Sequence, residues 1–348
     1  MTTQRFVVVI PVARYHERLA RCLEACSRLT YEPRTICVVS DDPLELPHDQ
    51  HFINVVTGAG GLTGPGAKRD LATLACPDAG VYAYLDDDAY PPPQWLDEAA
   101  AVLDQHPDAA GAGGPGLMPD DQTFWERVSS AVLGSPAGSG PLRFRFVLEA
   151  ARDCDDFPAY DMFVRRPWLT SVGGWATNWY GGEDTTLCAR LADRGGLLRY
   201  DPRLFVFHYR RPLWPAHAWQ IYNVGRSRGC FIRAKDSRSR RLAFAGPFAF
   251  LAGVLGFALL PFSGVPVAVA LGAAACAYTA LALLGSTPSD DWRVRLLTPL
   301  GLIIHHAAYA AGLTLGLLTG KRTVRGEDIT RSASWSTERS PTPNSGPG

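Results

Sequence analysis

The stretch Val81-Tyr-Ala-Tyr-Leu-Asp-Asp-Asp-Ala-Tyr-Pro-Pro-Pro93 joins a short apolar run to three consecutive carboxylates and then to a run of prolines. The apolar run predicts a buried strand, and Asp86, Asp87 and Asp88 follow at its carboxyl end. Like charges this close repel one another unless a cation lies among them. A divalent metal ion prefers carboxylate oxygens, and Asp86 and Asp88 can converge on one such ion. A solvated acidic turn is the alternative interpretation.

The composition of the 348-residue chain narrows the class of protein. The formal net charge is zero, so the chain has no overall nucleic-acid-binding signature and we expect no nucleic-acid partner. Eight cysteines are scattered without metal-ligand spacing, which predicts reduced thiols in a cytosol-facing protein. Strand-like sequence begins almost at once, so we expect no signal peptide.

The N-terminal segment predicts half of a nucleotide-binding α/β sheet. Residues 6–11 form an apolar strand pattern closed by a proline, residues 15–29 have helical spacing, and residues 35–40 form a second strand pattern. Asp41 and Asp42 follow the second strand. Ligands of such sheets bind at the carboxyl ends of the strands, so both aspartates are candidates for contact with the ribose or base of a nucleotide. An acidic turn is the alternative.

A glycine-rich segment, Gly58-Ala-Gly-Gly-Leu-Thr-Gly-Pro-Gly-Ala-Lys-Arg-Asp70, leads into a helix that we predict to begin at Ala67. Glycines let the backbone approach a ligand closely. Lys68 and Arg69 lie in the first helical turn, where positive charge opposes the helix dipole. A bound anion, and a diphosphate in particular, would explain these two cations. The segment does not match the P-loop or Rossmann fingerprints.

After a loop-rich region over residues 117–150, a loop of glycines and aromatic residues leads into a predicted helix over residues 185–195. Glu183 and Asp184 lie at the start of this helix, where a carboxylate serves either as an N-terminal cap or as a catalytic base. The aromatic loop in front of them is typical of a wall that stacks on a sugar or gates an acceptor. Its candidate side chains are Trp175, Trp179 and Tyr180.

Two short strand patterns, residues 196–200 and 204–208, follow that helix. His208 ends the second pattern. Imidazole nitrogen is a common ligand of divalent metal ions, so His208 is a candidate third ligand beside Asp86 and Asp88. A loop histidine without a ligand role is the alternative.

In their order along the chain, these motifs resemble the glycosyltransferase family 2 enzymes of GT-A fold, from residue 5 to about residue 210. Each motif is weak alone, but the ordered series is specific. The matching segments are Ile10-Pro-Val12, Leu19-x-x-Cys-Leu-Glu24, Val38-Val-Ser-Asp-Asp42, Gly66-Ala-Lys-Arg-Asp70, Leu85-Asp-Asp-Asp88, Gly173-Gly-Trp175 and Gly182-Glu-Asp-x-x-Leu-x-x-Arg-Leu191. The segment Gln220-Ile-Tyr-Asn-Val-Gly-Arg-Ser-Arg-Gly229 is similar to one in membrane-bound members related to succinoglycan-type exopolysaccharide glycosyltransferases.

The resemblance implies an α/β fold of GT-A type with a Rossmann-like mixed sheet. It implies inverting transfer of a sugar from a nucleotide-diphospho-sugar donor, with Mn²⁺ or Mg²⁺ as cofactor. The implied metal ligands are Asp86 and Asp88, and His208 stays the candidate third ligand from its position at the strand end. The implied donor-binding residues are Pro11, Asp41, Asp42, Gly66, Lys68, Arg69, Asp86 and Asp87. The implied general base is Asp184, with Glu183 as second choice, and Trp175, Trp179 and Tyr180 lie on the acceptor side.

The chain departs from the family pattern at several positions. Ala13-Arg14-Tyr15 stands where the family has Tyr-Asn-Glu, which leaves a uracil-type contact open. Ser40 replaces the first acid of the usual pair, and Asp70 replaces the usual Asn. The Gln-x-x-Arg-Trp motif of processive synthases is absent, so we expect transfer of a single sugar. These departures also leave room for a non-catalytic protein of the same fold that binds sugar nucleotides or acts as a scaffold.

The final third contains three uncharged apolar stretches, residues 242–260, 265–284 and 296–318, each near the length that spans a bilayer. The basic segment before them, residues 226–241, predicts by the positive-inside rule that the catalytic domain faces the cytoplasm. Three spans would put the basic residues after the third stretch outside, against the same rule, so the topology stays open. Residues 321–348, rich in Ser, Thr and Pro, are expected to be disordered.

We therefore predict a membrane-bound glycosyltransferase of the cell inner membrane. Its acceptor would be a lipid-linked or membrane-proximal glycan, in cell-envelope or exopolysaccharide biosynthesis. A transporter fits badly, because the spans are few and no paired broken helices are visible. His305 and His306 lie within the third apolar stretch, where polar helix–helix contacts or a functional role would explain them. The predicted segments are a GT-A catalytic domain (1–225), a basic juxtamembrane segment (226–241), two to three transmembrane helices (242–320) and the tail (321–348).

Overall fold

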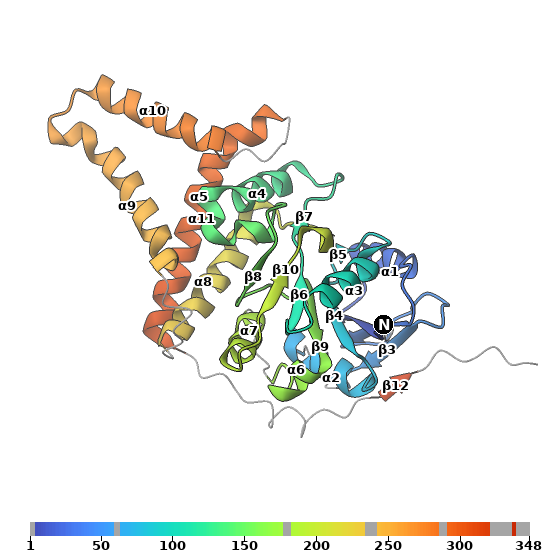
Figure 1. Cartoon of the computed structure of the whole chain (residues 1–348). Coiled ribbons are helices and arrows are strands. Elements are labelled where there is room, and N and C mark those ends of the chain that lie inside the picture. Colours follow the sequence, from blue (N-terminus) through green and yellow to red (C-terminus); the bar gives the residue numbers. More distant parts are fainter. Residues whose placement is uncertain are drawn as a thin grey trace, which may run out of the picture. The chain divides into compact units, whose positions relative to one another are not determined.

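The computed structural model describes residues 4–58, 63–176, 182–233, 242–284, 291–320 and 336–338. The chain forms two compact units, whose elements are labelled in Figure 1. The sheet unit comprises Met1–Leu117, Glu149–His208 and Thr323–Gly348, and the helical unit comprises Met118–Leu148 and Tyr209–Arg322. This division differs from the predicted boundary at residue 225, because residues 118–148 and 209–225 group with the C-terminal helices.

The main sheet of the sheet unit is mixed, as predicted. Within the described ranges it has nine strands in the order β12-β3-β2-β1-β4-β9-β6-β10-β8. Strands β3, β2, β1 and β4 run parallel, and β9 runs antiparallel between β4 and β6. The strand bounds are Phe6–Val12 (β1), Arg34–Ser40 (β2), Phe52–Val56 (β3), Val81–Leu85 (β4), Gly111–Gly113 (β6), Arg152–Cys154 (β8), Asp161–Arg165 (β9), Leu198–Tyr200 (β10) and Ser336–Glu338 (β12).

Helices cover both faces of this sheet, because alternate residues of a strand point to opposite sides. Phe6, Val8 and Ile10 of β1 pack in one buried cluster with the apolar residues of α1 and α3. Tyr82 of β4 points to the other side, where its hydroxyl donates to the Cys76 carbonyl at the end of α2. The helices of this unit are α1 (Glu17–Ser27), α2 (Pro65–Ala75), α3 (Trp95–Gln105), α6 (Arg166–Ser171) and α7 (Glu183–Asp193).

The strand order reverses at β1, which pairs with β2 on one side and with β4 on the other. Ligands of open α/β sheets bind at such a switch point, beyond the carboxyl ends of the strands. The carboxyl ends of β1, β2 and β4 place Val12, Asp41 and Asp86 at this edge. The topology therefore gathers the acidic strand ends that the sequence placed far apart.

A small second sheet places the strand that ends in His208 beside the segment that follows Asp86, Asp87 and Asp88. It contains β5 (Ala89–Tyr90), β11 (Val206–His208) and β7 (Gly116–Leu117), in the order β5-β11-β7. His208 lies opposite Ala89 in the antiparallel pair of β5 and β11. This pairing carries a histidine from far along the chain to the neighbourhood of Asp88.

The prediction of a loop-rich region over residues 117–150 is wrong. The helical unit has a regular helix there, α4 (Phe124–Gly134), which begins with a capping box. The backbone N–H of Thr123 donates to Oε2 of Glu126 at 2.9 Å. The Thr-x-x-Glu pattern is a sequence signature of a helix start and would have revealed α4. The short helices α5 (Pro136–Ser139) and η1 (Gly140–Arg145) follow it.

Helices α8 (Ala218–Arg233) and α11 (Trp292–Thr319) of the helical unit pack with their backbones in close approach. A Cβ atom added to Gly312 would lie 1.9 Å from the carbonyl oxygen of Tyr222, and one added to Gly316 would lie 2.1 Å from that of Arg226. Only glycine fits at these two positions, which is typical of close helix–helix contacts in membranes as well as in soluble proteins.

The two histidines of α11 make polar contacts with other elements, as one of the two interpretations predicts. Nδ1 of His305 lies 3.1 Å from Nε2 of His217, which is in the short helix η3 (Leu213–His217). Nε2 of His306 lies 3.0 Å from the carbonyl oxygen of Ala137 in α5. Both histidines therefore tie α11 to its neighbours within the helical unit.

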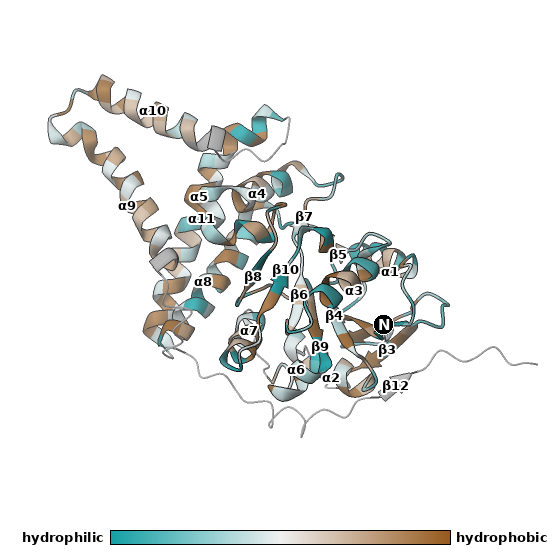
Figure 2. Ribbon diagram, in the orientation of Figure 1, coloured by the Kyte–Doolittle hydropathy of each residue, from teal (hydrophilic) through white to brown (hydrophobic). Residues whose placement is uncertain are grey.

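Helices α9 (Gly246–Leu259) and α10 (Val267–Leu284) are apolar over most of their length (Figure 2). In the part of the chain that is described, two helices are long and apolar enough to cross a membrane. Gly246–Ser263 has a mean hydropathy of 1.7 with 6% of its residues buried, and Trp292–Thr319 has 1.4 with 44% buried. Such helices are weak evidence, because core helices of soluble proteins reach the same length and hydropathy. Residues 234–241 and most of the predicted tail lie outside the described ranges.

Candidate active site

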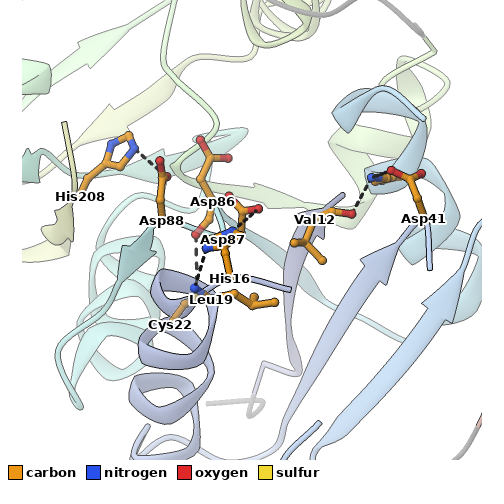
Figure 3. A network of polar contacts seen from close by, with 10 residues as sticks. Val12, His16, Leu19, Cys22, Asp41, Asp86, Asp87, Asp88 and His208 are labelled. Atoms are coloured by element: carbon orange, nitrogen blue, oxygen red, sulfur yellow. Dashed lines mark hydrogen bonds and ion pairs between the residues drawn. The ribbon is translucent and has the colours of Figure 1, made fainter. Parts of the chain in front are cut away.

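The three predicted metal ligands meet at one point. Asp86 and Asp88 follow β4, and β11 supplies His208. One ligand atom from each residue lies within 4.8 Å of the other two, and Nε2 of His208 lies 3.1 Å from Oδ1 of Asp88 (Figure 3). Two carboxylates and an imidazole are a suitable donor set for a divalent cation such as Mn²⁺ or Mg²⁺. These residues therefore fit the predicted metal ion.

The electrostatics of Asp86 also favour a cation. Burial raises the pKa of Asp86 to about 6, Arg69 opposes this shift, and the neighbouring Asp88 adds to it. A carboxyl group in such surroundings is more costly to ionise than one in water. A divalent ion beside it would favour the carboxylate, as the Arg69 guanidinium already does.

Asp87 has a different partner from its two neighbours. Its Oδ2 lies 3.1 Å from Nε2 of His16, and Nδ1 of His16 accepts the backbone N–H of Leu19 at the start of α1 (Figure 3). The hydrogen bond to Asp87 is the main cause that raises the pKa of His16. The sequence motifs did not point to His16, although a polar residue directly before a helix is a capping signal. The role of Asp87 in donor binding stays a prediction.

Lys68 is almost fully buried, with 3% of its surface exposed. Its Nζ donates to the carbonyl oxygen of Val12 at 2.6 Å and to Oδ2 of Asp41 at 2.7 Å. Oδ1 of Asp41 accepts the backbone N–H of Thr63 at 3.0 Å. Lys68 thus ties α2 to the ends of β1 and β2, and the anion beside it in this structure is Asp41. Asp42 is exposed.

Arg69 joins the two acidic motifs of the site. It is 2% exposed, and its Nη2 donates to Oδ1 of Asp86 at 3.0 Å while its Nη1 donates to Oε1 of Glu183 at 3.1 Å. The guanidinium carbon lies 4.5 Å from the centre of the Trp175 ring, within the range of a cation–π contact. A single side chain therefore links the candidate metal ligands to the start of α7.

Trp175 does not form the exposed acceptor wall that the sequence predicts. Its side chain is 0% exposed, and its ring meets Tyr84 edge-on with centroids 4.8 Å apart. The ring lies against Arg69 because the loop that carries it folds inward onto α2. Trp179 and Tyr180, the other two predicted acceptor-side residues, lie outside the described ranges.

Glu183 and Asp184 begin α7 and have different partners. Gly182 precedes them with a φ of +104°, a left-handed conformation that favours glycine. Glu183 binds Arg69, whereas Oδ1 of Asp184 accepts the backbone N–H of Thr185 at 2.7 Å. The structure thus connects Glu183 with the candidate metal cluster through Arg69, which the sequence could not show. Which of the two acids is the base stays a prediction.

The two remaining predicted donor-binding residues have no polar side chain, and their role in donor binding stays a prediction. Pro11 is buried within β1, and Gly66 is buried in the first turn of α2.

Two further charged residues beside the site were missed as functional candidates. Asp70 of α2 accepts hydrogen bonds from the loop that carries Trp175, and Arg190 of α7 donates to the same loop. The departure from the family pattern at Asp70 was the available signal.

The chain is similar to proteins of one enzyme class. Residues 7–168 match the family model described as Glycosyl transferase family 2. The chain is 25% identical over 227 residues to the pre-mycofactocin glycosyltransferase of Mycobacterium tuberculosis, in strains CDC 1551 / Oshkosh and ATCC 25618 / H37Rv. The match covers 59% of this chain and 42% of each relative, so the chain spans less than half the length of these relatives.

The fold is also similar to that of a solved structure, the mannosyltransferase PcManGT from Pyrobaculum calidifontis in complex with GDP-Man and Mn²⁺. The TM-score is 0.56 at 17% identity, and the similarity covers 88% of this chain and 87% of that chain. At this identity the similarity concerns the fold, and it confirms the predicted GT-A-like mixed sheet. The matched family model supports a glycosyl transferase family 2 domain over residues 7–168.

Proposed function

We propose that this chain is a membrane-anchored glycosyltransferase that depends on a divalent metal ion and moves one sugar, with inversion, from a nucleotide-diphospho-sugar donor. The observation that carries the proposal is the convergence of Asp86, Asp88 and His208 within 4.8 Å beside the carboxyl ends of the parallel strands. Departure of a nucleotide diphosphate requires neutralisation of developing negative charge, and a divalent ion held by these three residues would supply it.

The acceptor hydroxyl needs a general base, because an inverting transfer is a single displacement without a covalent nucleophile. We propose Asp184 for this role, since Glu183 already binds the Arg69 guanidinium. The carboxylate of Asp184 would take the hydroxyl proton while the hydroxyl oxygen attacks the anomeric carbon and the bond to the diphosphate breaks. Glu183 is the second candidate. Substitution of each acid in turn would therefore show which of the two carboxylates acts as the base.

The donor class follows from the same site. A nucleotide diphosphate suits the candidate metal cluster, and the structure of PcManGT was solved with GDP-Man and Mn²⁺. Asp41 and Asp42 at the end of β2 are our candidates for contact with the nucleoside, although Asp41 also binds Lys68. The family motif of processive synthases is absent from the sequence, which supports transfer of a single sugar.

Membrane anchoring is supported by the exposed apolar surface of the helical unit. Along α9, Leu255, Phe257 and Leu259 are all exposed, and the described residues of this helix include no buried one. In α11 the exposed Trp292, Leu296 and Leu300 recur at helical spacing, as a lipid-facing stripe would. We therefore propose a lipid-linked or membrane-proximal glycan acceptor, and a plasma-membrane location with the catalytic domain in the cytoplasm.

The proposal is tested with the full chain in detergent micelles. GDP-mannose, UDP-N-acetylglucosamine and related nucleotide sugars are screened with Mn²⁺ or Mg²⁺, first for a shift in the thermal unfolding midpoint and then for release of nucleotide diphosphate to water. We expect one donor to stabilise the protein and to be hydrolysed, both only with metal. Hydrolysis of none of these donors would refute the enzymatic proposal, and binding without turnover would favour the scaffold alternative.

A further inference from the structure

We infer that Asp70 and Arg190 are positioning residues of this site. Between them they hold the backbone of residues 172–176, so that Trp175 lies against Arg69 and Arg69 in turn holds Asp86 and Glu183 at a fixed separation. The effect on turnover rests on the proposed function, whereas the hold on the loop can be measured without any activity.

Asp70 binds two successive backbone N–H groups of the loop. Its Oδ1 accepts from Trp175 at 2.7 Å, and its Oδ2 accepts from Ala176 at 2.9 Å. Each carboxylate oxygen therefore has its own donor. An asparagine at this position would offer one acceptor oxygen, and its amide N–H₂ would face the second N–H group as donor against donor. The geometry thus requires a carboxylate and explains why this chain has Asp where an Asn is usual.

Arg190 binds the carbonyl groups of the same loop from α7. Its Nη1 donates to Val172 at 2.9 Å, and its Nη2 donates to Gly174 at 2.8 Å and to Trp175 at 2.6 Å. The planar guanidinium can reach these three oxygens at once because its N–H groups form a rigid fork. Two charged side chains, one from each of two helices, therefore bind the loop through five backbone groups.

The loop needs this support because its backbone is held in uncommon conformations. Gly173 and Gly174 have φ values of +75° and +76°, and Ala176 has a φ of +47°. A side chain such as that of alanine rarely adopts this region without compensation from its surroundings. At Gly174 an added Cβ would lie 2.5 Å from Oδ1 of Asp70, so the carboxylate can approach only because this residue is glycine.

The position of the loop affects the site through two side chains, those of Trp175 and Arg69. The hydrogen bonds on its N–H and carbonyl groups fix where the ring of Trp175 lies, and the ring packs 4.5 Å from the Arg69 guanidinium. Arg69 is buried and donates to Asp86 on one side and to Glu183 on the other. A shift of the ring would free Arg69 to move, and a displacement of about 1 Å in a catalytic arrangement can cost about 100-fold in rate.

The test compares wild type with Asp70→Asn and Arg190→Lys in the full chain, with Asp78→Asn as the matched control on the exposed turn after α2. Two quantities are measured: the amide hydrogen exchange of the peptide that contains Trp175 and Ala176, and kcat and donor KM for metal-dependent hydrolysis. The probe is GDP-mannose with Mn²⁺, or the screened donor with the fastest wild-type turnover. A shared role predicts faster exchange in both variants and a kcat at least about tenfold lower, with donor KM within about threefold.

The inference is overturned if the exchange of this peptide matches wild type in Asp70→Asn, or if exchange rises while kcat stays at the level of Asp78→Asn. If Asp70→Asn does not fold, Arg190→Lys keeps the positive charge but loses the fork, and the same two readouts decide. A wild-type protein that hydrolyses no nucleotide sugar would contradict the proposed function alone, since the exchange measurement still shows whether Asp70 and Arg190 hold the loop.

Discussion

Helix α2 in the sheet unit and helix α9 in the helical unit distribute their side chains in opposite ways. In α2, Lys68 and Arg69 are buried, although lysine and arginine are rarely buried without a partner. In α9, Leu255, Phe257 and Leu259 are exposed, although large apolar side chains usually pack in a core. Each helix thus departs from the ordinary pattern of a soluble protein, and each departure needs an explanation in its surroundings.

The explanations differ in kind. The charges of α2 are compensated inside the sheet unit, where carboxylates from the ends of β2 and β4 and from the start of α7 bind them. The apolar face of α9 has no such compensation within the described residues, and a lipid bilayer is our proposal for what contacts it. The buried cations of α2 thus indicate an internal polar site, and for the exposed apolar helix α9 we propose an external partner.

The largest expected effect comes from removing the centre of the charged network. We expect Asp86→Ala to lower metal-dependent turnover by about 10³-fold, because the variant loses a ligand of the candidate cation that neutralises the leaving diphosphate. The measurement is donor hydrolysis at saturating Mn²⁺. Asp108→Asn, on an exposed turn of the same unit, is the control. Turnover within twofold of wild type in Asp86→Ala would remove the metal site from the mechanism.

Removing the buried Arg69 guanidinium should lower the stability of the protein. Arg69→Met leaves the carboxylates of Asp86 and Glu183 without their shared partner, and breaking a buried ion pair on one side costs about 3 kcal/mol or more. The free energy of unfolding of the full chain, from urea titration in detergent, measures this loss. Arg28→Met breaks an exposed pair with Glu24 and should cost less than about 1 kcal/mol. Equal losses in the two variants would show that burial does not distinguish these arginines.

The proposed base should affect turnover but not donor binding. We expect Asp184→Asn to lower kcat by about 100-fold, the lower end for a general base, with the donor dissociation constant unchanged. Glu183→Gln, which loses the charge that Arg69 binds, should lower both kcat and stability. If Asp184→Asn binds the donor as wild type does and also keeps the wild-type kcat, Asp184 is not the general base. The role would then fall to Glu183 or to neither acid.

The other side of the comparison is tested on α9. We expect Leu255→Asp to weaken membrane association by about 2.5 kcal/mol, the cost of an acidic side chain near the centre of a spanning helix. The fraction of full chain that remains with the membrane pellet after a carbonate wash reports this change. Leu74→Asp, at an exposed leucine of the sheet unit, should leave the fraction unchanged. If Leu255→Asp leaves the same fraction of the chain in the membrane pellet as wild type, α9 does not contact lipid.

The smallest expected effect is a pH dependence of metal binding. The pKa of Asp86 is raised to about 6, so below pH 6 a proton competes with the cation for this carboxylate. Binding is therefore strongest above pH 6 and weakens as the pH falls. Between pH 7 and pH 5 we expect about tenfold weaker Mn²⁺ binding, measured by calorimetry in a non-chelating buffer. A constant affinity over this range would contradict the assigned role of Asp86.

The sequence predicted the sheet edge of the candidate site well, since apolar runs that end in acids indicate strand ends. Asp41, Asp86 and Asp88 lie where this pattern placed them, and the structure brings His208 to the same cluster. It did not predict α4, because the helix carries aromatic and serine residues that blurred its periodicity, and the capping box at Thr123 was overlooked. It also misjudged Trp175, whose aromatic side chain suits an exposed wall and a buried core equally well.

Local sequence is enough to tell which chemical groups stand at the strand ends and which helices are apolar, because the patterning of polar and apolar residues sets secondary structure. The partners of Lys68, Arg69 and Asp70, in contrast, follow from the folded arrangement of distant segments. Lys68 binds Asp41, Arg69 binds Asp86 and Glu183, and Asp70 binds the loop that carries Trp175. These partners lie up to 114 residues away along the chain. Contacts over such separations depend on strand order and helix placement, and no local pattern encodes them.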